Sequence, residues 1–158
     1  MLSRGYEIAL QPSWPAFWAE ASPLAHAHAE EVDGGVEPRR RFKVDEPRMN
    51  AICEMGVLKL ITAHKDGRMV GYFTWNVTVD LESEGLLIGQ QGAWYCAPGN
   101  WRAAVLMFDY SIEVLKENGV QCIFPHHRTQ GRGANIGRFF MRRGAKLIQF
   151  GYCLWIGA

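Results

Sequence analysis

The sequence lacks a large excess of charge of either sign. Its 158 residues carry 17 Lys and Arg against 16 Asp and Glu, which gives a formal net charge of +1. A chain that binds nucleic acid through its overall field usually carries a clear surplus of basic side chains. We therefore do not expect nucleic acid as the main partner, and the charge balance indicates no other partner.

Paired cysteines are also missing. The four cysteines are widely spaced and form no C-x-x-C motif: Cys53, Cys96, Cys122 and Cys153. Three of them lie inside apolar, strand-like runs, so we expect buried reduced thiols rather than disulfides or a zinc site. His26, His28, Glu30 and Glu31 superficially resemble metal ligands, but their spacing completes no known site. We expect no bound metal.

Long hydrophobic runs are absent as well. No segment approaches the roughly 20 apolar residues that span a bilayer, and the amino terminus has Arg4 but no apolar signal-peptide region. We therefore expect no membrane partner and a place in the reducing cytoplasm. There is no repeat, and a 48% apolar composition is enough for one substantial core. One domain over residues 1–158 is the simplest prediction.

The first half of the chain is predicted to form a short strand, two helices and a hairpin. The strand covers Tyr6–Leu10, and apolar residues then recur at helical spacing from Trp14 to about Glu31. Asp45 followed by Pro47 is typical of a second helix start. The strand-like runs Leu58–Ala63 and Met69–Val79 are joined by a polar segment with Asp66-Gly67, which favours a tight hairpin turn.

The last third has the order strand, turn, long helix, strand, short helix and two closing strands. The corresponding ranges are Leu86–Cys96, Pro98–Arg102, Asn100–Asn118, Val120–Phe124, Ala134–Arg143, Lys146–Phe150 and Tyr152–Ile156. The long helix is predicted to bury an apolar stripe: Ala104, Val105, Phe108, Ile112 and Leu115. A turn with an arginine before a helix directs N–H groups and the helix dipole at one point, which suits a phosphate. An ordinary strand-to-helix turn is the alternative.

Three segments resemble the GNAT N-acyltransferase superfamily. They are the hairpin LKLITAHKDGRMVGYFTW, the strand-turn-helix WYCAPGNWRAAVLMF and the segment NIGRFFMRRGAKL near the end. With the helical first third, the resemblance covers nearly the whole chain, and it is most similar to compact GNAT-like proteins of bacteriophages. It implies an α+β (α/β) fold, in which a mixed, mostly antiparallel sheet with splayed central strands is flanked by about four helices.

The resemblance also implies acetyl-CoA as cosubstrate and an amine of a small molecule or protein as acceptor. In such proteins the pantetheine arm lies between the splayed strands, here those that end near Cys96 and Phe124, and the pyrophosphate sits on the turn before the long helix. The residues expected to bind acetyl-CoA are Trp94, Tyr95, Cys96, Trp101, Arg102, Ala103, Ala104 and Asn135. For Asn135 the alternative is a helix cap. Val105 and Met107 hold the family's glycine positions, where side chains would crowd the pyrophosphate.

Both customary catalytic groups of the family are replaced. Amine acylation needs a base for the amine and an acid for the leaving thiolate. The family usually supplies a Glu on the strand before the turn, where this sequence has Gln90 and Gln91, and an amide cannot take a proton at neutral pH. It usually supplies a Tyr four residues before the glycine that ends the last helix, where this sequence has Phe140.

The candidate catalytic residues are therefore Tyr95, His126 and Gln91. Tyr95 lies on the central strand, and its phenol would protonate the thiolate if it points into the gap; the alternative is a core tyrosine. His126 follows the next strand, where an imidazole suits base catalysis; a solvated loop histidine is the alternative. Holding both reactants together accelerates the reaction even with a weak acid and base.

The same replacements leave a second hypothesis open. A GNAT-shaped protein that performs no chemistry would use an exposed surface to bind a host or virion protein. A group of arginines near the last helix fits the adenosine phosphate of CoA, an acidic partner, RNA or simply a solvated helix face: Arg128, Arg132, Arg138, Arg142 and Arg143. The sequence indicates neither the acceptor amine nor the oligomeric state.

Overall fold

The computed structural model describes residues 2–3, 5–33, 42–126 and 133–147. The chain divides into two compact units, Met1–Phe124 and Pro125–Ala158. The first unit contains a six-stranded sheet and helices α1 to α3, and the described part of the second contains helix α4 (Gly133–Arg142). The organisation as a single domain stays a prediction.

The six strands lie in the sheet in the order of the chain. They are β1 (Leu2–Ser3), β2 (Tyr6–Leu10), β3 (Leu58–Lys65), β4 (Arg68–Val79), β5 (Leu87–Cys96) and β6 (Cys122–Phe124). Neighbours from β1 to β5 are antiparallel, and β6 is parallel to β5. The mixed sheet and its flanking helices confirm the predicted fold class. The sequence missed β1, because two residues are too few to show an alternating pattern.

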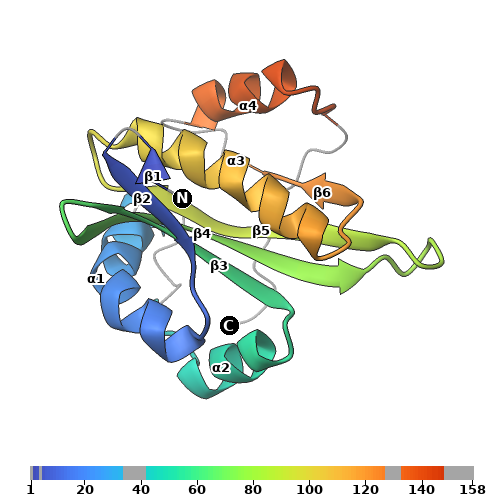
Figure 1. Ribbon diagram of the computed structural model, residues 1–158, viewed down its shortest axis with the longest axis horizontal. Helices are drawn as coiled ribbons and strands as arrows, with labels where there is room; N and C mark the ends of the chain where they lie inside the picture. Colours follow the sequence, from blue (N-terminus) through green and yellow to red (C-terminus); the bar gives the residue numbers. More distant parts are fainter. Residues whose placement is uncertain (1, 4, 34–41, 127–132, 148–158) are drawn as a thin grey trace, which may run out of the picture. The chain divides into compact units, whose positions relative to one another are not determined.

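Helices cover both faces of the sheet (Figure 1). Helices α1 (Trp14–Asp33) and α2 (Glu46–Glu54) pack on one face, here called the α1 face, and α3 (Trp101–Glu117) packs on the other, the α3 face. Helix α1 continues through Pro23, and α2 begins after Asp45, whose carboxylate accepts the N–H of Arg48 at 3.2 Å. The sequence predicted the first helix from the helical spacing of its apolar residues and the start of the second from Asp45 and Pro47, which are local signals.

The hairpin between β3 and β4 has the predicted tight turn. Asp66 and Gly67 both adopt positive φ angles, 51° and 72°, and Lys65 pairs directly with Arg68 across the turn. The strands therefore extend further than predicted, and only two residues connect them. A turn with two positive φ angles matches the right-handed twist of the flanking strands.

The buried stripe of α3 differs from the predicted one. Phe108 and Leu115 are buried as predicted, but Val105 and Ile112 are only partly buried. The buried residues of α3 are Ala103, Met107, Phe108, Ser111, Val114 and Leu115. The predicted buried face of α3 was wrong because the apolar residues of α3 lie on more than one side of the helix. The side that is buried depends on the packing of α3 against the sheet.

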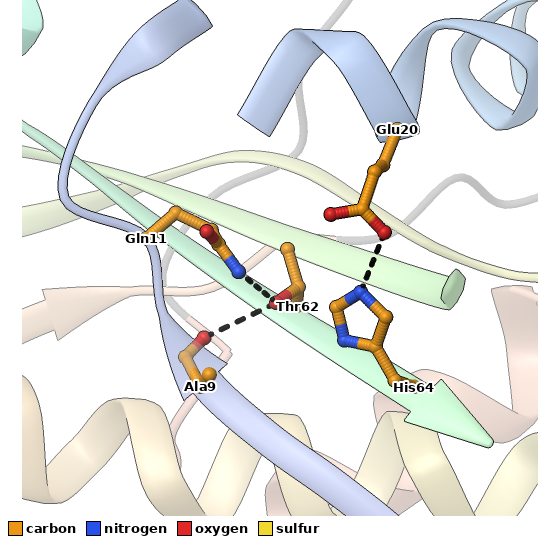
Figure 2. Close-up of polar contacts among 5 residues, drawn as sticks. All are labelled: Ala9, Gln11, Glu20, Thr62 and His64. Atoms are coloured by element: carbon orange, nitrogen blue, oxygen red, sulfur yellow. Dashed lines mark hydrogen bonds and ion pairs between the residues drawn. The ribbon is translucent and has the colours of Figure 1, made fainter. Parts of the chain in front are cut away.

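Polar contacts between α1, the β2 end and β3 hold the α1 face together (Figure 2). Thr62 is fully buried, and its hydroxyl accepts from Gln11 Nε2 at 2.8 Å and donates to the Ala9 carbonyl at 3.4 Å. His64 Nε2 lies 2.9 Å from a carboxylate oxygen of Glu20, which links β3 to α1. The two bonds of Thr62 satisfy a hydroxyl that would otherwise be costly to bury, whereas the pair of His64 with the half-exposed Glu20 lies nearer the surface.

Three further predictions can be compared with the described residues. Lys146 and Leu147 have no regular secondary structure, and the rest of the two closing strands lies outside the described residues, as does Cys153. Cys53, Cys96 and Cys122 are free cysteines, but Cys53 and Cys96 are only partly buried and Cys122 is exposed, whereas buried thiols were predicted. A Cβ atom at residue 89 would meet the side chains of both Ile123 and Leu115 of α3, so Ile123 lies on the α3 side, and alternation along the strand turns Cys122 to the opposite side. No helix in the described ranges has both the length and the apolar character needed to cross a membrane.

Candidate functional site

The parallel pairing of β5 with β6 is short. Its register contains three pairs, from Ile88 with Cys122 to Gln90 with Phe124, whereas β5 continues to Cys96. In the described part of the chain, the segment 91–96 of β5 therefore extends beyond the β6 ladder. All three residues of β6 pair with β5, so the splay of the central strands that the resemblance implies stays a prediction.

A β-bulge interrupts β5 just beyond the last pair with β6. Phe73 pairs with Trp94 and Trp75 pairs with Gln91, so Thr74 of β4 faces two residues of β5, Gly92 and Ala93. The Thr74 hydroxyl accepts the N–H of Ala93 at 2.8 Å. A Cβ atom at residue 92 would lie 2.4 Å from that hydroxyl, so the position requires glycine unless Thr74 moves. Bulges of this kind redirect side chains and are common next to active sites.

Three of the predicted site residues on β5 face α3. Trp94 stacks on Phe73 with ring centroids 4.9 Å apart, and Gln91 shares the face of its cross-strand partner Trp75. Cys96 lies beside Gly71 on the same face. Burial raises the pKa of Cys96 to about 12, so its thiol is protonated at neutral pH and is no nucleophile. These side chains belong to the packing between sheet and helix.

We expect Gly71→Ala to lower the free energy of unfolding by about 1–3 kcal/mol, since overpacking a tight interior site forces neighbours to shift. A Cβ there would lie 2.5 Å from Cys96 Sγ and 2.8 Å from the Tyr95 carbonyl oxygen, which is backbone. Urea unfolding followed by circular dichroism measures the change. Gly89→Ala is the matched control, because its nearest neighbour is a side-chain carbon of Ile123 at 3.2 Å. Equal losses in both variants would contradict the prediction.

Tyr95 faces α1 and belongs to a cluster of three rings. His28 of α1 stacks on Tyr95 with centroids 4.8 Å apart and planes inclined by 20°. His28 Nδ1 also lies 2.8 Å from the hydroxyl oxygen of Tyr72 on β4, and the two tyrosine rings are 6.2 Å apart. Burial, and to a smaller extent the nearby Tyr95, raises the pKa of Tyr72, so its phenol is neutral.

The sequence prediction missed this cluster. His28 was considered only as a metal ligand, although it follows the buried residues Ala21 and Ala25 at helical spacing and so lies on the side of α1 that faces the sheet. His26 instead packs against Phe42, with ring centroids 5.0 Å apart. In the described ranges, no three His, Cys, Asp or Glu side chains gather as metal ligands would.

The start of α3 follows directly from the end of β5. The N–H groups of Ala103 and Ala104 donate to the Asn100 carbonyl at 2.9 and 3.4 Å, so they are not available to a ligand. Within the described residues, no hydrogen bond engages the N–H groups of Trp101 and Arg102, and both side chains are exposed. The Arg102 guanidinium lies 5.6 Å from the Trp101 ring centre. Two free donors, one guanidinium and the positive end of the helix dipole therefore occupy one place.

Met107 does not crowd this helix start. It is fully buried, and its Cε atom lies close to Gly71 of β4, in the core between α3 and the sheet. Val105 is partly buried. The expectation that a side chain at position 107 obstructs a phosphate is therefore wrong, because the helix turns that position toward the sheet.

The other predicted site residues belong to the second unit. Asn135 is the third residue of α4 and its side-chain oxygen accepts a hydrogen bond from Arg138, so it does not cap the helix. Phe140 is buried, and His126 is exposed after β6. His126 and Asn135 thus remain candidates on the evidence of the sequence.

Solved structures resemble this chain over its whole length, although neither a family model nor a curated protein matches its sequence. An aminoglycoside acetyltransferase from an uncultured soil metagenomic sample superposes with a TM-score of 0.70 at 13% identity, covering 99% of this chain and 100% of that one. A ribosomal-protein-alanine N-acetyltransferase from Brucella melitensis gives 0.69 at 16% identity, with 96% and 99% coverage. Glucosamine-6-phosphate N-acetyltransferase from Arabidopsis thaliana gives 0.70 at 7% identity, with 96% and 99% coverage.

Identities this low establish the fold and leave the reaction to be argued from the residues. The superpositions nevertheless extend over nearly complete chains, with TM-scores of 0.70 and 0.69. This chain has the fold of the GNAT N-acetyltransferases.

Proposed function

We propose that the protein transfers an acetyl group from acetyl-CoA to an amine of a small molecule or a protein. One observation carries the proposal: the segment of β5 that extends beyond β6 leads directly into a helix start with two free N–H groups and an exposed arginine. A thioester on a long arm with a pyrophosphate at its other end suits this arrangement. We place the activity in the cytoplasm, where free thiols persist.

The helix start suits the pyrophosphate of acetyl-CoA. The N–H groups of Trp101 and Arg102 and the Arg102 guanidinium supply donors and positive charge to phosphate oxygens. Met107 is directed into the core and does not obstruct the turn. The pantetheine amides would pair with backbone groups of the 91–96 segment of β5. Trp94 and Cys96 would therefore bind acetyl-CoA through their backbone rather than their side chains.

The acyl transfer itself needs few protein groups. The amine nitrogen attacks the thioester carbonyl, the carbon–sulfur bond breaks, and the electron pair leaves with the CoA sulfur, which then takes a proton. Tyr95 is our candidate donor of that proton, because it lies on the 91–96 segment of β5. Gln91 faces α3 and carries an amide, which accepts no proton at neutral pH.

The acceptor is best described as a primary amine. The structural neighbours are named for aminoglycosides, for alanine of a ribosomal protein and for glucosamine-6-phosphate, all of which present an amine. On this chain the acceptor would approach from the α1 face, since the α3 face of β5 is filled by Trp94, Phe73 and Phe108.

Calorimetric titration with acetyl-CoA tests the proposal. We expect saturable binding of one molecule per chain with a dissociation constant between about 1 μM and 1 mM, the usual range of enzyme substrates. Release of free CoA thiol in the presence of a panel of primary amines then measures transfer. Absence of binding at millimolar acetyl-CoA would contradict the proposal and favour a GNAT-shaped binding protein without chemistry.

A further inference from the structure

We infer that the exposed ring of Trp101 stacks on the adenine of acetyl-CoA, so that the protein selects a nucleotide-bearing acetyl donor over a shorter acetyl thioester. This inference rests on the proposed acetyl transfer and names the part of the donor that decides its selection. The proposed function uses the backbone N–H of Trp101 and gives its side chain no role. The exposure and surroundings of that side chain supply one.

Trp101 differs from the other tryptophans of the described ranges. It is 68% exposed, whereas Trp14 and Trp75 are buried and Trp18 and Trp94 are partly buried. An indole ring covers about 150–250 Å² when it packs against a partner, and an offset stack with another aromatic ring is one of its favoured contacts. The fold leaves most of this surface uncovered, so it is available to a ligand.

A guanidinium lies beside the ring. The Arg102 guanidinium carbon is 5.6 Å from the centre of the Trp101 ring. In the part of the chain that the structure describes, no other charged or aromatic side chain lies over this ring, and no carboxylate pairs with Arg102. A cation over one face of an aromatic ring leaves the opposite face for stacking. A flat apolar ring next to an unpaired guanidinium suits a ligand that carries both an aromatic ring and phosphates, and the nucleotide end of acetyl-CoA carries both.

The backbone that carries Trp101 is held in place from β2. Tyr6 of β2 is buried, and its hydroxyl donates to Asn100 Oδ1 at 3.3 Å. Asn100 Nδ2 donates to the carbonyls of Ala97 and Pro98, each at 3.2 Å, which fixes the turn before the helix. A ring on a fixed backbone loses less conformational entropy on binding than a ring on a mobile loop. The platform for the adenine is therefore formed before the donor arrives.

The turn next to the ring is open on its outer side. Gly99 adopts a φ of +84°, and a Cβ atom at this residue would meet no atom within 4 Å beyond its chain neighbours. The phosphates would bind the N–H groups of Trp101 and Arg102, and the adenine would lie on the ring of Trp101. One ribose links the adenine to the phosphates, which matches binding groups on two consecutive residues.

The consequence is selection between two kinds of acetyl donor. Acetyl-CoA ends in an adenosine nucleotide, whereas the acetyl-4′-phosphopantetheine arm of an acyl carrier protein has the same thioester and one phosphate but no adenine. Stacking of a base on an aromatic side chain strengthens binding about 10-fold. The ring of Trp101 therefore favours acetyl-CoA and adds nothing for the shorter donor.

Titrations of Trp101→Ala with two donors test the inference. We expect the dissociation constant for acetyl-CoA to rise about 10-fold and that for S-acetyl-4′-phosphopantetheine to stay within about twofold, because only the first donor carries a base. Trp101→Phe keeps a smaller ring and should show an intermediate loss. In turnover, KM for acetyl-CoA should rise while kcat at saturating donor stays unchanged, since the adenine contributes to binding and not to the chemical step.

Leu81→Ala is the matched control. Leu81 is 99% exposed in the loop between β4 and β5, at the opposite end of β5 from the turn, and its removal should leave both affinities unchanged. Equal weakening of both donors by Trp101→Ala would overturn the inference, since an effect transmitted through Arg102 or the pantetheine arm would reach both. Unchanged affinity for acetyl-CoA would overturn it as well. In either case the proposed function stands, whereas an unmodified protein that binds neither donor would overturn both.

Discussion

Trp75→Ala is expected to lower the free energy of unfolding by about 3–5 kcal/mol, the usual cost of removing a large aromatic side chain from a core. Trp75 is fully buried, and its ring lies 4.8 Å from that of Phe73, which in turn stacks on Trp94 and Phe108. Its Nε1 has no hydrogen-bond partner in the described ranges, so the loss is one of packing. The free energy of unfolding of a domain is only about 5–15 kcal/mol, so the expected loss is a large share of the total stability.

Urea unfolding followed by far-ultraviolet circular dichroism measures that loss. Trp101→Ala is the matched control, since the same exchange at a side chain that is 68% exposed should change stability by less than about 0.5 kcal/mol. If Trp75→Ala does not fold, Trp75→Phe retains a ring and should show an intermediate loss. Similar values for positions 75 and 101 would contradict the placement of Trp75 in the core.

Arg102→Glu is expected to weaken acetyl-CoA binding by about 100-fold. A hydrogen bond to a charged group contributes about 1.5–3 kcal/mol, and the introduced carboxylate adds repulsion of the phosphates and opposes the helix dipole. Because each 1.4 kcal/mol is a factor of ten in affinity, the change is well within the range of calorimetry. The weakening should be larger at low ionic strength, where charges at an exposed site are less screened.

Arg48→Glu controls for the change in net charge. Arg48 is exposed on α2, which packs on the α1 face of the sheet and is separated in sequence from the turn before α3. We expect its acetyl-CoA affinity to stay within about twofold of the unmodified protein, since distant exposed charges are screened. If Arg48→Glu and Arg102→Glu weaken binding equally, the phosphates do not bind at the start of α3.

Local signals predicted the elements of this fold well. The Asp66-Gly67 turn, the Asp45 cap and the order of strands and helices all follow from residues close in sequence. The register of β4 with β5 did not follow, because the bulge depends on the contact of Thr74 with Ala93, 19 positions apart. No pattern within one strand records such a pairing.

The sequence also did not predict which side of α3 is buried. Apolar residues occur around much of the helix. Packing against the sheet buries Met107 and Ser111, while Val105 and Ile112 stay partly exposed. The burial of Met107 means that this side chain does not obstruct the turn. Matching residues to a family pattern can therefore mislead, because the tertiary packing determines the direction in which each side chain points.

The sequence by itself determined the order of the elements and the place of the turn before the long helix, because secondary structure follows from periodicity and capping over short distances, and the resemblance implied the fold class. Only the tertiary structure brought His28, Tyr72 and Tyr95 together. These residues are separated by 44 and 23 positions, and their contact exists because α1 packs across β4 and β5. Helical spacing gives the side of α1 on which a histidine lies, but not which strand it meets.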